Sequence, residues 1–231
     1  MSGKRLADQD RVIVFDLDDT LYMERDFARS GYRAVGDWTR AKLGLEGFGD
    51  HVWRLFLEKP RPNLFDLALE AADIEPKPEL IRQMVEVYRD HRPKIALLPD
   101  AERILAKRAN YRGFALLTDG YHSTQQRKID ALELAAICQP VVPTDQWGRD
   151  YWKPHARGFE TIQAHYGLPS HAFTYVGDNP TKDFIAPKSL GWHTVRLRRP
   201  GALHVLRTAP SPVAEAAVSI TSLDDLAKAL A

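Results

Sequence analysis

Cysteine is almost absent from this sequence, since Cys138 is the only one among 231 residues. A single cysteine excludes an internal disulfide, and it has no partner at the spacing of a metal site. We therefore expect Cys138 to be a small buried apolar residue.

Long hydrophobic runs are also missing. The apolar run that precedes Asp16 is only four residues long, too short for the core of a signal peptide. No run approaches the roughly 20 apolar residues that a membrane-spanning helix requires. We therefore expect a cytoplasmic protein with no membrane partner.

An excess of one charge is the third absence. Lys and Arg total 32 against 31 Asp and Glu, and the formal net charge is +1. Nucleic-acid-binding domains usually carry a basic excess or stripe, so we expect no nucleic-acid partner. The composition, 44% hydrophobic and 27% charged residues, is typical of a globular protein.

Short apolar runs recur along the chain with helical patterns between them. The predicted strands are residues 12–15, 114–118, 137–142, 173–177, 193–197 and 217–220. The stretches 100–109, 123–135, 155–166 and 181–190 carry apolar residues at helical spacing, and residues 221–230 are expected to form a terminal helix that Thr221 or Ser222 caps. This alternation predicts an α/β fold with a doubly wound, mainly parallel, Rossmann-like sheet.

One interval breaks the alternation. Residues 21–96 contain four helical patterns, punctuated by proline and glycine, and no convincing strand. We therefore expect an all-helical domain at 20–96, inserted after the first strand of a core formed by 1–19 and 97–231.

Polar residues follow four of the predicted strands. Asp16 and Asp18 come after the first strand, Thr118 ends the second, Lys153 follows the third, and Asp178 follows the fourth. Ligands of open α/β sheets bind beyond the carboxyl ends of the strands, so these side chains are expected to converge on one crevice.

This order of motifs resembles the haloacid dehalogenase superfamily, and more narrowly its magnesium-dependent phosphatases with a helical cap. The resemblance covers nearly the whole chain. Asp16-x-Asp18-x-Thr20 matches the first motif of that family, Thr118 the second and Lys153 the third. Gly177-Asp178 with Asp183 matches the fourth.

The resemblance implies a phosphatase that hydrolyses a small phosphorylated metabolite through an aspartyl-phosphate. It makes Asp16 the nucleophile and Asp18 the general acid and base. Asp16, the main-chain carbonyl of Asp18, and Asp178 would hold Mg²⁺, which explains why several acids can lie together. Asp19 is expected to be structural.

The remaining motif residues receive supporting roles from the same resemblance. Thr118, Asp119 and Lys153 would bind the phosphoryl group, with Lys153 neutralising charge between nucleophile and phosphate. Asp183, Asn179 and Thr20 would support these groups: Asp183 by orienting Lys153 or a metal-bound water, Thr20 by fixing the backbone around Asp16.

Two positions depart from the family pattern. Members often carry Asn where this sequence has Asp119, and an extra carboxylate there opposes a phosphate unless it turns away or pairs with a cation. His155 stands where relatives often have an acid.

The helical insert resembles the cap that closes over the crevice in this family. Its hinges are expected just after Thr20 and near residues 95–99. Candidate substrate contacts are Arg25, Tyr22 and His122, followed by Tyr121, Arg29, Arg33 and Arg61. The sequence leaves open which metabolite binds and whether the protein is a monomer or a homodimer.

Three other functions remain open at this point. A dehalogenase would use the Asp16 nucleophile without a metal, and it would not need Asp18. A phosphomutase would have to exclude water from the phospho-enzyme. A non-enzymatic, phospho-accepting regulatory domain uses similar acids, but it spans about half this length and has no long helical insert.

Overall fold

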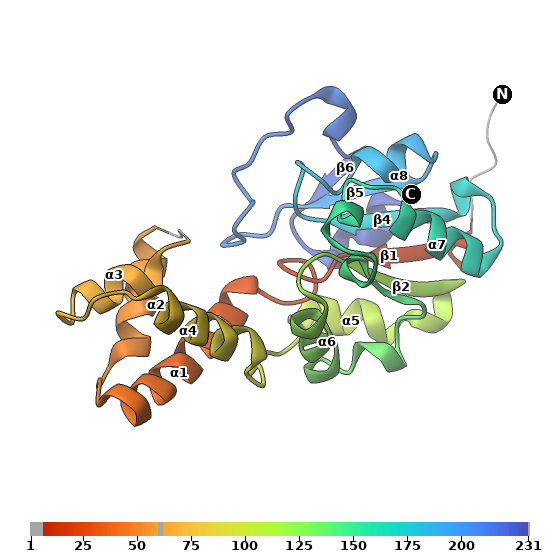
Figure 1. The fold of residues 1–231 in the computed structure, drawn as a ribbon. Helices are drawn as coiled ribbons and strands as arrows, with labels where there is room; N and C mark the ends of the chain where they lie inside the picture. Colours follow the sequence, from red (N-terminus) through yellow and green to blue (C-terminus); the bar gives the residue numbers. More distant parts are fainter. Residues whose placement is uncertain (1–6, 60–61, 231) are drawn as a thin grey trace. The chain divides into compact units, whose positions relative to one another are not determined.

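The computed structural model describes residues 7–59 and 62–230, and it divides into two compact units (Figure 1). The described residues up to Glu24, together with those from Ala96 onward, form a sheet-bearing unit. Residues Arg25–Ile95 form a helical unit. No helix in the described part of the chain is both long and apolar enough to cross a bilayer.

Six strands form one sheet in which every neighbouring pair is parallel. They are β1 (Val12–Phe15), β2 (Gly113–Thr118), β3 (Val141–Pro143), β4 (Phe173–Gly177), β5 (His193–Leu197) and β6 (Val218–Ile220). Their spatial order is β3-β2-β1-β4-β5-β6, which is the doubly wound order of the Rossmann fold. The predicted fold class is confirmed.

The central strand β1 explains this arrangement locally. All four of its residues are fully buried, as a strand covered on both faces requires. Val12 pairs with Gly113 of β2 on one side and with Phe173 of β4 on the other. The direction in which successive strands are added to the sheet reverses between β1 and β4, and ligands of such sheets bind at that switch point.

Helices cover both faces of the sheet. They are α5 (Pro99–Ala106), α6 (His122–Ala131), α7 (Arg157–Tyr166) and α8 (Ile185–Ser189), with the short α9 (Leu226–Ala229) near the end of the chain. Val12 and Val14 share one apolar cluster with Phe159 of α7 and Ala186 of α8. Since side chains alternate along a strand, Ile13 and Phe15 face the other side, where Figure 1 shows α5 and α6.

Several predicted boundaries differ from the structure for local reasons. The strand expected at 137–142 begins only at Val141, because the 3₁₀ turn Leu134–Ala136 extends into Ile137 and Cys138, whose N–H groups both donate to the carbonyl of Leu134. The helix expected at 181–190 begins at Ile185, after a hydrogen-bonded loop. At the predicted terminal helix, the Ser222 hydroxyl accepts from the N–H of Asp224, but it caps a 3₁₀ turn at Leu223–Asp225, and the α-helix begins only at Leu226.

The helical unit is built from α1 (Glu24–Leu43), α2 (Phe48–Glu58), α3 (Leu64–Glu70) and α4 (Pro78–Asp90). One apolar cluster holds them together, with Val35, Val52, Leu69 and Met84 fully buried in it. This unit therefore has its own core, as an independently packed domain requires.

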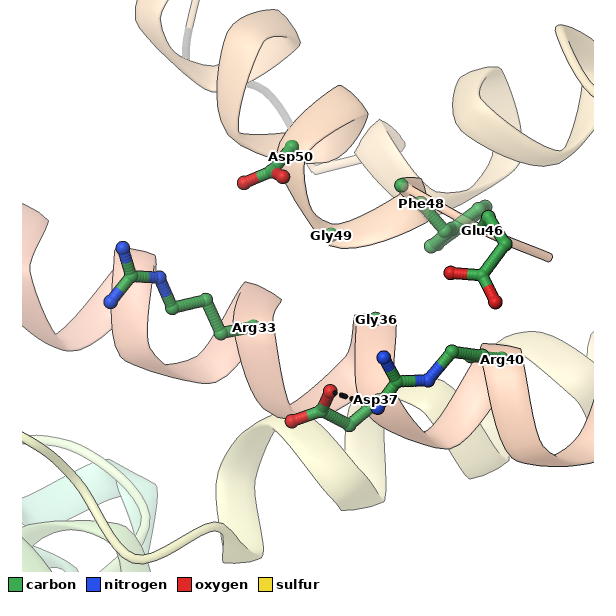
Figure 2. A pocket seen from close by; sticks show the side chains of 9 residues that line it. Arg33, Gly36, Asp37, Arg40, Glu46, Phe48, Gly49 and Asp50 are labelled. Carbon is green, nitrogen blue, oxygen red and sulfur yellow. Dashed lines mark hydrogen bonds and ion pairs between the residues drawn. The ribbon is translucent and has the colours of Figure 1, made fainter.

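Two glycines let α1 and α2 approach closely. A methyl group on Gly36 would lie 2.8 Å from the backbone nitrogen of Gly49, and one on Gly49 would collide with the carbonyl of Tyr32. Beside this crossing lies an open pocket of about 380 Å³, with Arg33 and Arg40 on α1 opposite Asp50 on α2 (Figure 2).

A buried carboxylate connects distant parts of the sheet-bearing unit. Asp100, at the start of α5, accepts hydrogen bonds from Arg199 (2.9 Å), Ser222 (3.0 Å) and the N–H of Leu223 (2.8 Å). Arg199 also donates to the carbonyl of Thr20, 3.1 Å away. Asp100 thereby ties the C-terminal segment to the turn that follows β1.

Replacing Asp100 with alanine is expected to lower the free energy of unfolding by about 3–5 kcal/mol, because Arg199 would stay buried without a counter-charge. Urea denaturation measures this change. Asp224→Ala is the matched control, since Asp224 pairs with Arg103 at an exposed position and its loss should change stability far less. Equal effects of the two substitutions would contradict the structural role of Asp100.

Candidate active site

The site lies where β1 and β4 end, beside the switch point of the sheet. Asp16 follows β1 directly, and its N–H donates to the carbonyl of Val176 in β4 at 2.8 Å. Asp178 follows β4, and Thr118 is the last residue of β2. Parallel strands end at the same edge of the sheet, so three sequence-predicted residues reach one place.

Lys153 joins them from the loop after β3. Its side chain is completely buried, and its Nζ donates to Asp16 Oδ1 (2.7 Å) and to the hydroxyl of Tyr175 (2.8 Å). Nζ also forms an ion pair with Asp183 Oδ1 at 2.8 Å. The structure thus brings Asp16, the candidate nucleophile, into direct contact with Lys153, the lysine of the third motif.

Three buried carboxylates form a cluster around this ammonium group. Ligand oxygens of Asp16, Asp178 and Asp183 all lie within 4.8 Å of one another. Burial, together with the negative charge of Asp183, raises the pKa of Asp178 to about 9. Burial also raises the pKa of Asp16 to about 6, against the opposing charge of Lys153. With all three acids ionised, the cluster would therefore carry more negative charge than the ammonium group of Lys153 neutralises.

A divalent cation fits this cluster. Asp178 Oδ2 is buried and accepts no hydrogen bond from the described residues, and carboxylate oxygens are the ligands that Mg²⁺ prefers. Asp183 is already engaged: Oδ1 contacts Lys153, and Oδ2 accepts the N–H of Asn179 at 2.8 Å. Asp178 has a free oxygen and Asp16 uses only Oδ1 for Lys153, so these two carboxylates have the greater capacity for a metal, whereas each oxygen of Asp183 already contacts the protein.

The loop after β4 is shaped by that contact. A methyl group on Gly177 would lie 2.6 Å from Asp183 Oδ2, so a larger residue would displace the carboxylate. Asn179 Oδ1 accepts from both the N–H (3.0 Å) and the hydroxyl (2.7 Å) of Thr181. Asn179 and Asp183 thus fix the loop backbone, as a supporting role requires.

Asp18 is held by three donors. Lys128 Nζ lies 2.7 Å from Oδ1, the hydroxyl of Tyr22 donates to the same oxygen, and Gln125 Nε2 lies 3.0 Å from Oδ2. Burial opposes ionisation of Asp18, but Lys128 and these hydrogen bonds hold its pKa below the ordinary value. Asp18 is therefore ionised at neutral pH in this structure.

Both carboxylate oxygens of Asp119 contact donors of the protein. Its Oδ1 accepts from the hydroxyl of Thr144 (2.8 Å) and from the N–H of Lys153 (3.0 Å). Its Oδ2 pairs with Lys182 Nζ at 2.9 Å. The neighbouring Thr118 hydroxyl accepts from Gln125 at 2.5 Å. The ammonium group of Lys182 thus neutralises Asp119, the additional carboxylate of the second motif.

Asp19 and Thr20 shape the turn after the nucleophile. Asp19 has a left-handed backbone (φ 54°), and its carboxylate accepts the N–H groups of Glu24 (2.9 Å) and Leu203 (2.7 Å). This is the structural role expected for Asp19. Thr20 is buried, and its hydroxyl makes no hydrogen bond with the described residues; its carbonyl, held by Arg199, is the group that fixes the turn.

The candidate substrate contacts lie in different environments. Tyr22 is fully buried with its hydroxyl on Asp18, and His122 is exposed at the start of α6, where its N–H donates to Asp145 at 2.9 Å. Tyr121 is 37% exposed. Arg25, Arg29 and Arg33 belong to the helical unit, and Arg61 lies outside the described residues.

The sequence prediction omitted several residues that the site contains. They are Gln125, Lys128, Thr144, Tyr175 and Lys182. Spacing offered a signal for two of them: Gln125 and Lys128 are three residues apart on a helix and therefore share one face. Lys182 could have been found because it directly precedes Asp183, a residue of the fourth motif.

The curated relatives are similar over most of their length. The glyceraldehyde 3-phosphate phosphatase of Methanopyrus kandleri is 28% identical over 200 residues, which cover 82% of this chain and 84% of the relative. The phosphoserine phosphatase of Thermus thermophilus is 28% identical over 230 residues, with 82% and 89% covered.

Solved structures share the fold at lower identity. A putative HAD-hydrolase from Bacillus subtilis bound to magnesium has a TM-score of 0.67 at 16% identity and covers 96% of this chain and 99% of its own. An L-2-haloacid dehalogenase from Xanthobacter autotrophicus has a TM-score of 0.61 at 19% identity, with 94% and 97% covered.

The family model described as haloacid dehalogenase-like hydrolase matches residues 11–191, a range that contains every motif residue discussed above. This protein therefore belongs to the haloacid dehalogenase-like hydrolase family.

Proposed function

We propose that this protein is a magnesium-dependent phosphatase that hydrolyses a small phosphomonoester through an aspartyl-phosphate. The observation that carries the proposal is the contact of Asp16 with Lys153 (2.7 Å) inside a cluster of buried carboxylates that suits a divalent cation. The relatives named glyceraldehyde 3-phosphate phosphatase and phosphoserine phosphatase support it.

The cation would be held by Asp16, Asp178 and the main-chain carbonyl of Asp18. When bound, Mg²⁺ supplies positive charge that lets a carboxylate approach a phosphate dianion. Lys153 adds to this charge and, through its bonds to Asp16 and Tyr175, orients the nucleophile. Asp16 then attacks phosphorus, the P–O bond to the leaving group breaks, and an aspartyl-phosphate forms.

The leaving alkoxide needs a proton, which Asp18 would deliver. Asp18 is ionised in this structure, so it must first receive that proton. Lys128 and Tyr22 each direct a hydrogen at Oδ1, so either can transfer one as charge develops on the alkoxide. In the second half-reaction Asp18 takes a proton from water, which attacks phosphorus, releases inorganic phosphate and restores Asp16. Asp18 then passes this proton back to the donor, Lys128 or Tyr22, which restores the starting state.

The helical unit is proposed to act as the cap, and Arg25, Arg29 and Arg33 are the anion-binding candidates on α1. A cytoplasmic location and a monomeric or homodimeric state are part of the same proposal. The Asp18 and Asp178 carboxylates favour phosphoryl transfer over dehalogenation, which attacks carbon and needs no metal ligands.

Purified protein is expected to hydrolyse p-nitrophenyl phosphate in Mg²⁺ and to lose at least about 99% of this activity in excess chelator, because the carboxylate cluster would then repel the phosphate. Activity that returns on adding Mg²⁺ controls for unfolding. Glyceraldehyde 3-phosphate, phosphoserine, sugar phosphates and nucleotides should follow as substrates. Equal rates with and without metal would contradict the mechanism, and isomerised product without free phosphate would indicate a mutase.

A further inference from the structure

Lys153 is mostly committed to the protein. An ammonium group has three N–H donors, and Lys153 donates to Asp16 (2.7 Å) and Tyr175 (2.8 Å) and forms an ion pair with Asp183 at 2.8 Å. Its side chain has no exposed surface. Lys153 therefore has at most one N–H left for a phosphoryl oxygen.

Lys128 is also committed to the protein. Its side chain is 5% exposed, and its ammonium group lies 2.7 Å from Asp18 Oδ1. Lys128 therefore neutralises Asp18 directly, and any effect it has on a phosphate acts through that carboxylate.

Lys182 differs from both. It lies in the loop between β4 and α8, its side chain is 31% exposed, and its Nζ contacts Asp119 Oδ2 at 2.9 Å. Within residues 7–59 and 62–230, Asp119 is its only hydrogen-bonding or ion-pair partner. Two of its three N–H donors therefore remain for a ligand.

The charges around Lys182 place it at the same cluster. Burial and the nearby Lys153 oppose its positive charge, but Asp119, followed by the acids of the carboxylate cluster, raises its pKa above the ordinary value. Lys182 is therefore a permanent cation at neutral pH, close enough to the nucleophile for their charges to interact.

Asp119 holds that cation in place. Its Oδ1 is fixed by Thr144 and by the N–H of Lys153, so only Oδ2 is directed at Lys182. Asp119 is the residue next to Thr118, which is the expected phosphate-binding residue. An anchored carboxylate at this position sets the Lys182 ammonium group beside the phosphate-binding end of β2.

We propose that Lys182 donates a hydrogen bond to a non-bridging oxygen of the substrate's phosphoryl group, and that Asp119 is the positioning residue that holds it there. This inference rests on the proposed phosphatase function and adds to it a second ammonium group, beside that of Lys153, that contacts the phosphate. It also explains why this chain tolerates Asp where the family often has Asn: the carboxylate and Lys182 form one unit.

The test measures binding of inorganic phosphate, the product, by calorimetry in saturating Mg²⁺, alongside KM and kcat for p-nitrophenyl phosphate. Lys182→Met is expected to weaken phosphate binding by about 10- to 100-fold, the effect of one charge-assisted hydrogen bond. Lys107→Met, a lysine at an exposed position of the same unit, is the matched control and should bind phosphate as the wild type does.

Lys182→Met alone also leaves Asp119 without its cation, which would repel phosphate and could destabilise the fold. The double variant Asp119→Asn/Lys182→Met removes both charges. If Lys182 contacts phosphate, the double variant stays at least about tenfold weaker than the wild type. If Lys182 only neutralises Asp119, the double variant recovers wild-type phosphate affinity, and this result would overturn the proposal.

Asp119→Asn alone keeps the ammonium group but removes its anchor. It should raise KM more than it lowers kcat, and it should leave Mg²⁺ affinity, followed by thermal shift, unchanged. Wild-type protein that binds no phosphate in Mg²⁺ would also overturn the inference. Wild-type protein that binds phosphate through Lys182 but hydrolyses no phosphomonoester would refute the proposed function while leaving the Lys182 contact standing.

Discussion

Asp16→Asn is expected to reduce kcat for phosphomonoester hydrolysis by about 10⁴-fold or more, the scale seen when an enzyme loses its nucleophile. An amide has nearly the same shape as the carboxylate, and its oxygen can still accept from Lys153, but it cannot attack phosphorus. Turnover of p-nitrophenyl phosphate in saturating Mg²⁺ measures the effect.

The same substitution should not destabilise the metal-free protein. Burial raises the pKa of Asp16 to about 6, so the charged carboxylate is less favourable in the folded protein than in the unfolded chain. Removing that charge is therefore expected to leave Tm unchanged or slightly raised. Asp37→Asn, at an exposed position on α1, is the matched control with full activity. Residual turnover above about 1% of wild type would exclude Asp16 as the nucleophile.

The sequence was sufficient for the residues whose position follows from the strands. Buried parallel strands are continuous apolar runs, so β1, β4 and β5 were predicted with their observed bounds. Asp16, Thr118 and Asp178 stand at the ends of such strands, and the parallel sheet brings strand ends together. The place of Lys153 after the third strand was also visible in the sequence, but its role required the family resemblance, because a loop lysine carries no pattern of its own.

Side chains that act through distant partners could not be predicted in this way. Asp18 meets Lys128 across 110 positions of sequence, and Asp119 meets Lys182 across 63. Neither pairing follows from periodicity, since each depends on how a loop or helix packs on the sheet. Asp119 therefore seemed to oppose phosphate, although its carboxylate is in fact neutralised.

The bounds of short strands were the other feature that the sequence did not predict. The strand expected at 137–142 contains apolar residues throughout except Gln139 and Pro140, yet its first residues belong to a turn that closes on Leu134. Backbone hydrogen bonding decided that boundary, and hydrophobicity alone carries no information about it.

The second large effect concerns Mg²⁺ and pH. The stabilisation of this protein by Mg²⁺ is expected to grow steeply from pH 6 to pH 9. Burial raises the pKa of Asp178 to about 9, so at neutral pH the metal-free site holds a proton that must leave before the carboxylate can bind a cation. Apparent affinity should therefore rise by about tenfold per pH unit in this range, and more steeply below about pH 6, where Asp16 also takes up a proton.

The metal-free protein should show the opposite trend. In the unfolded chain both carboxyl groups titrate near pH 4, whereas in the folded protein Asp178 titrates at about 9. Between these values the folded state binds more protons than the unfolded state, so the free energy of unfolding falls as pH rises. Above the folded pKa this contribution is fully lost, and bound Mg²⁺ compensates for it.

Thermal denaturation across pH 6 to 9, with 10 mM Mg²⁺ or with chelator, measures both trends. Asp178→Asn is the control, because an amide carries no proton to release: its metal-free Tm should depend less on pH, and Mg²⁺ should raise it only slightly. A Mg²⁺-induced Tm shift of constant size from pH 6 to pH 9 would contradict the argument. Such a result would mean that the ion binds without displacing a proton from Asp178, and hence that this buried carboxylate is not its ligand.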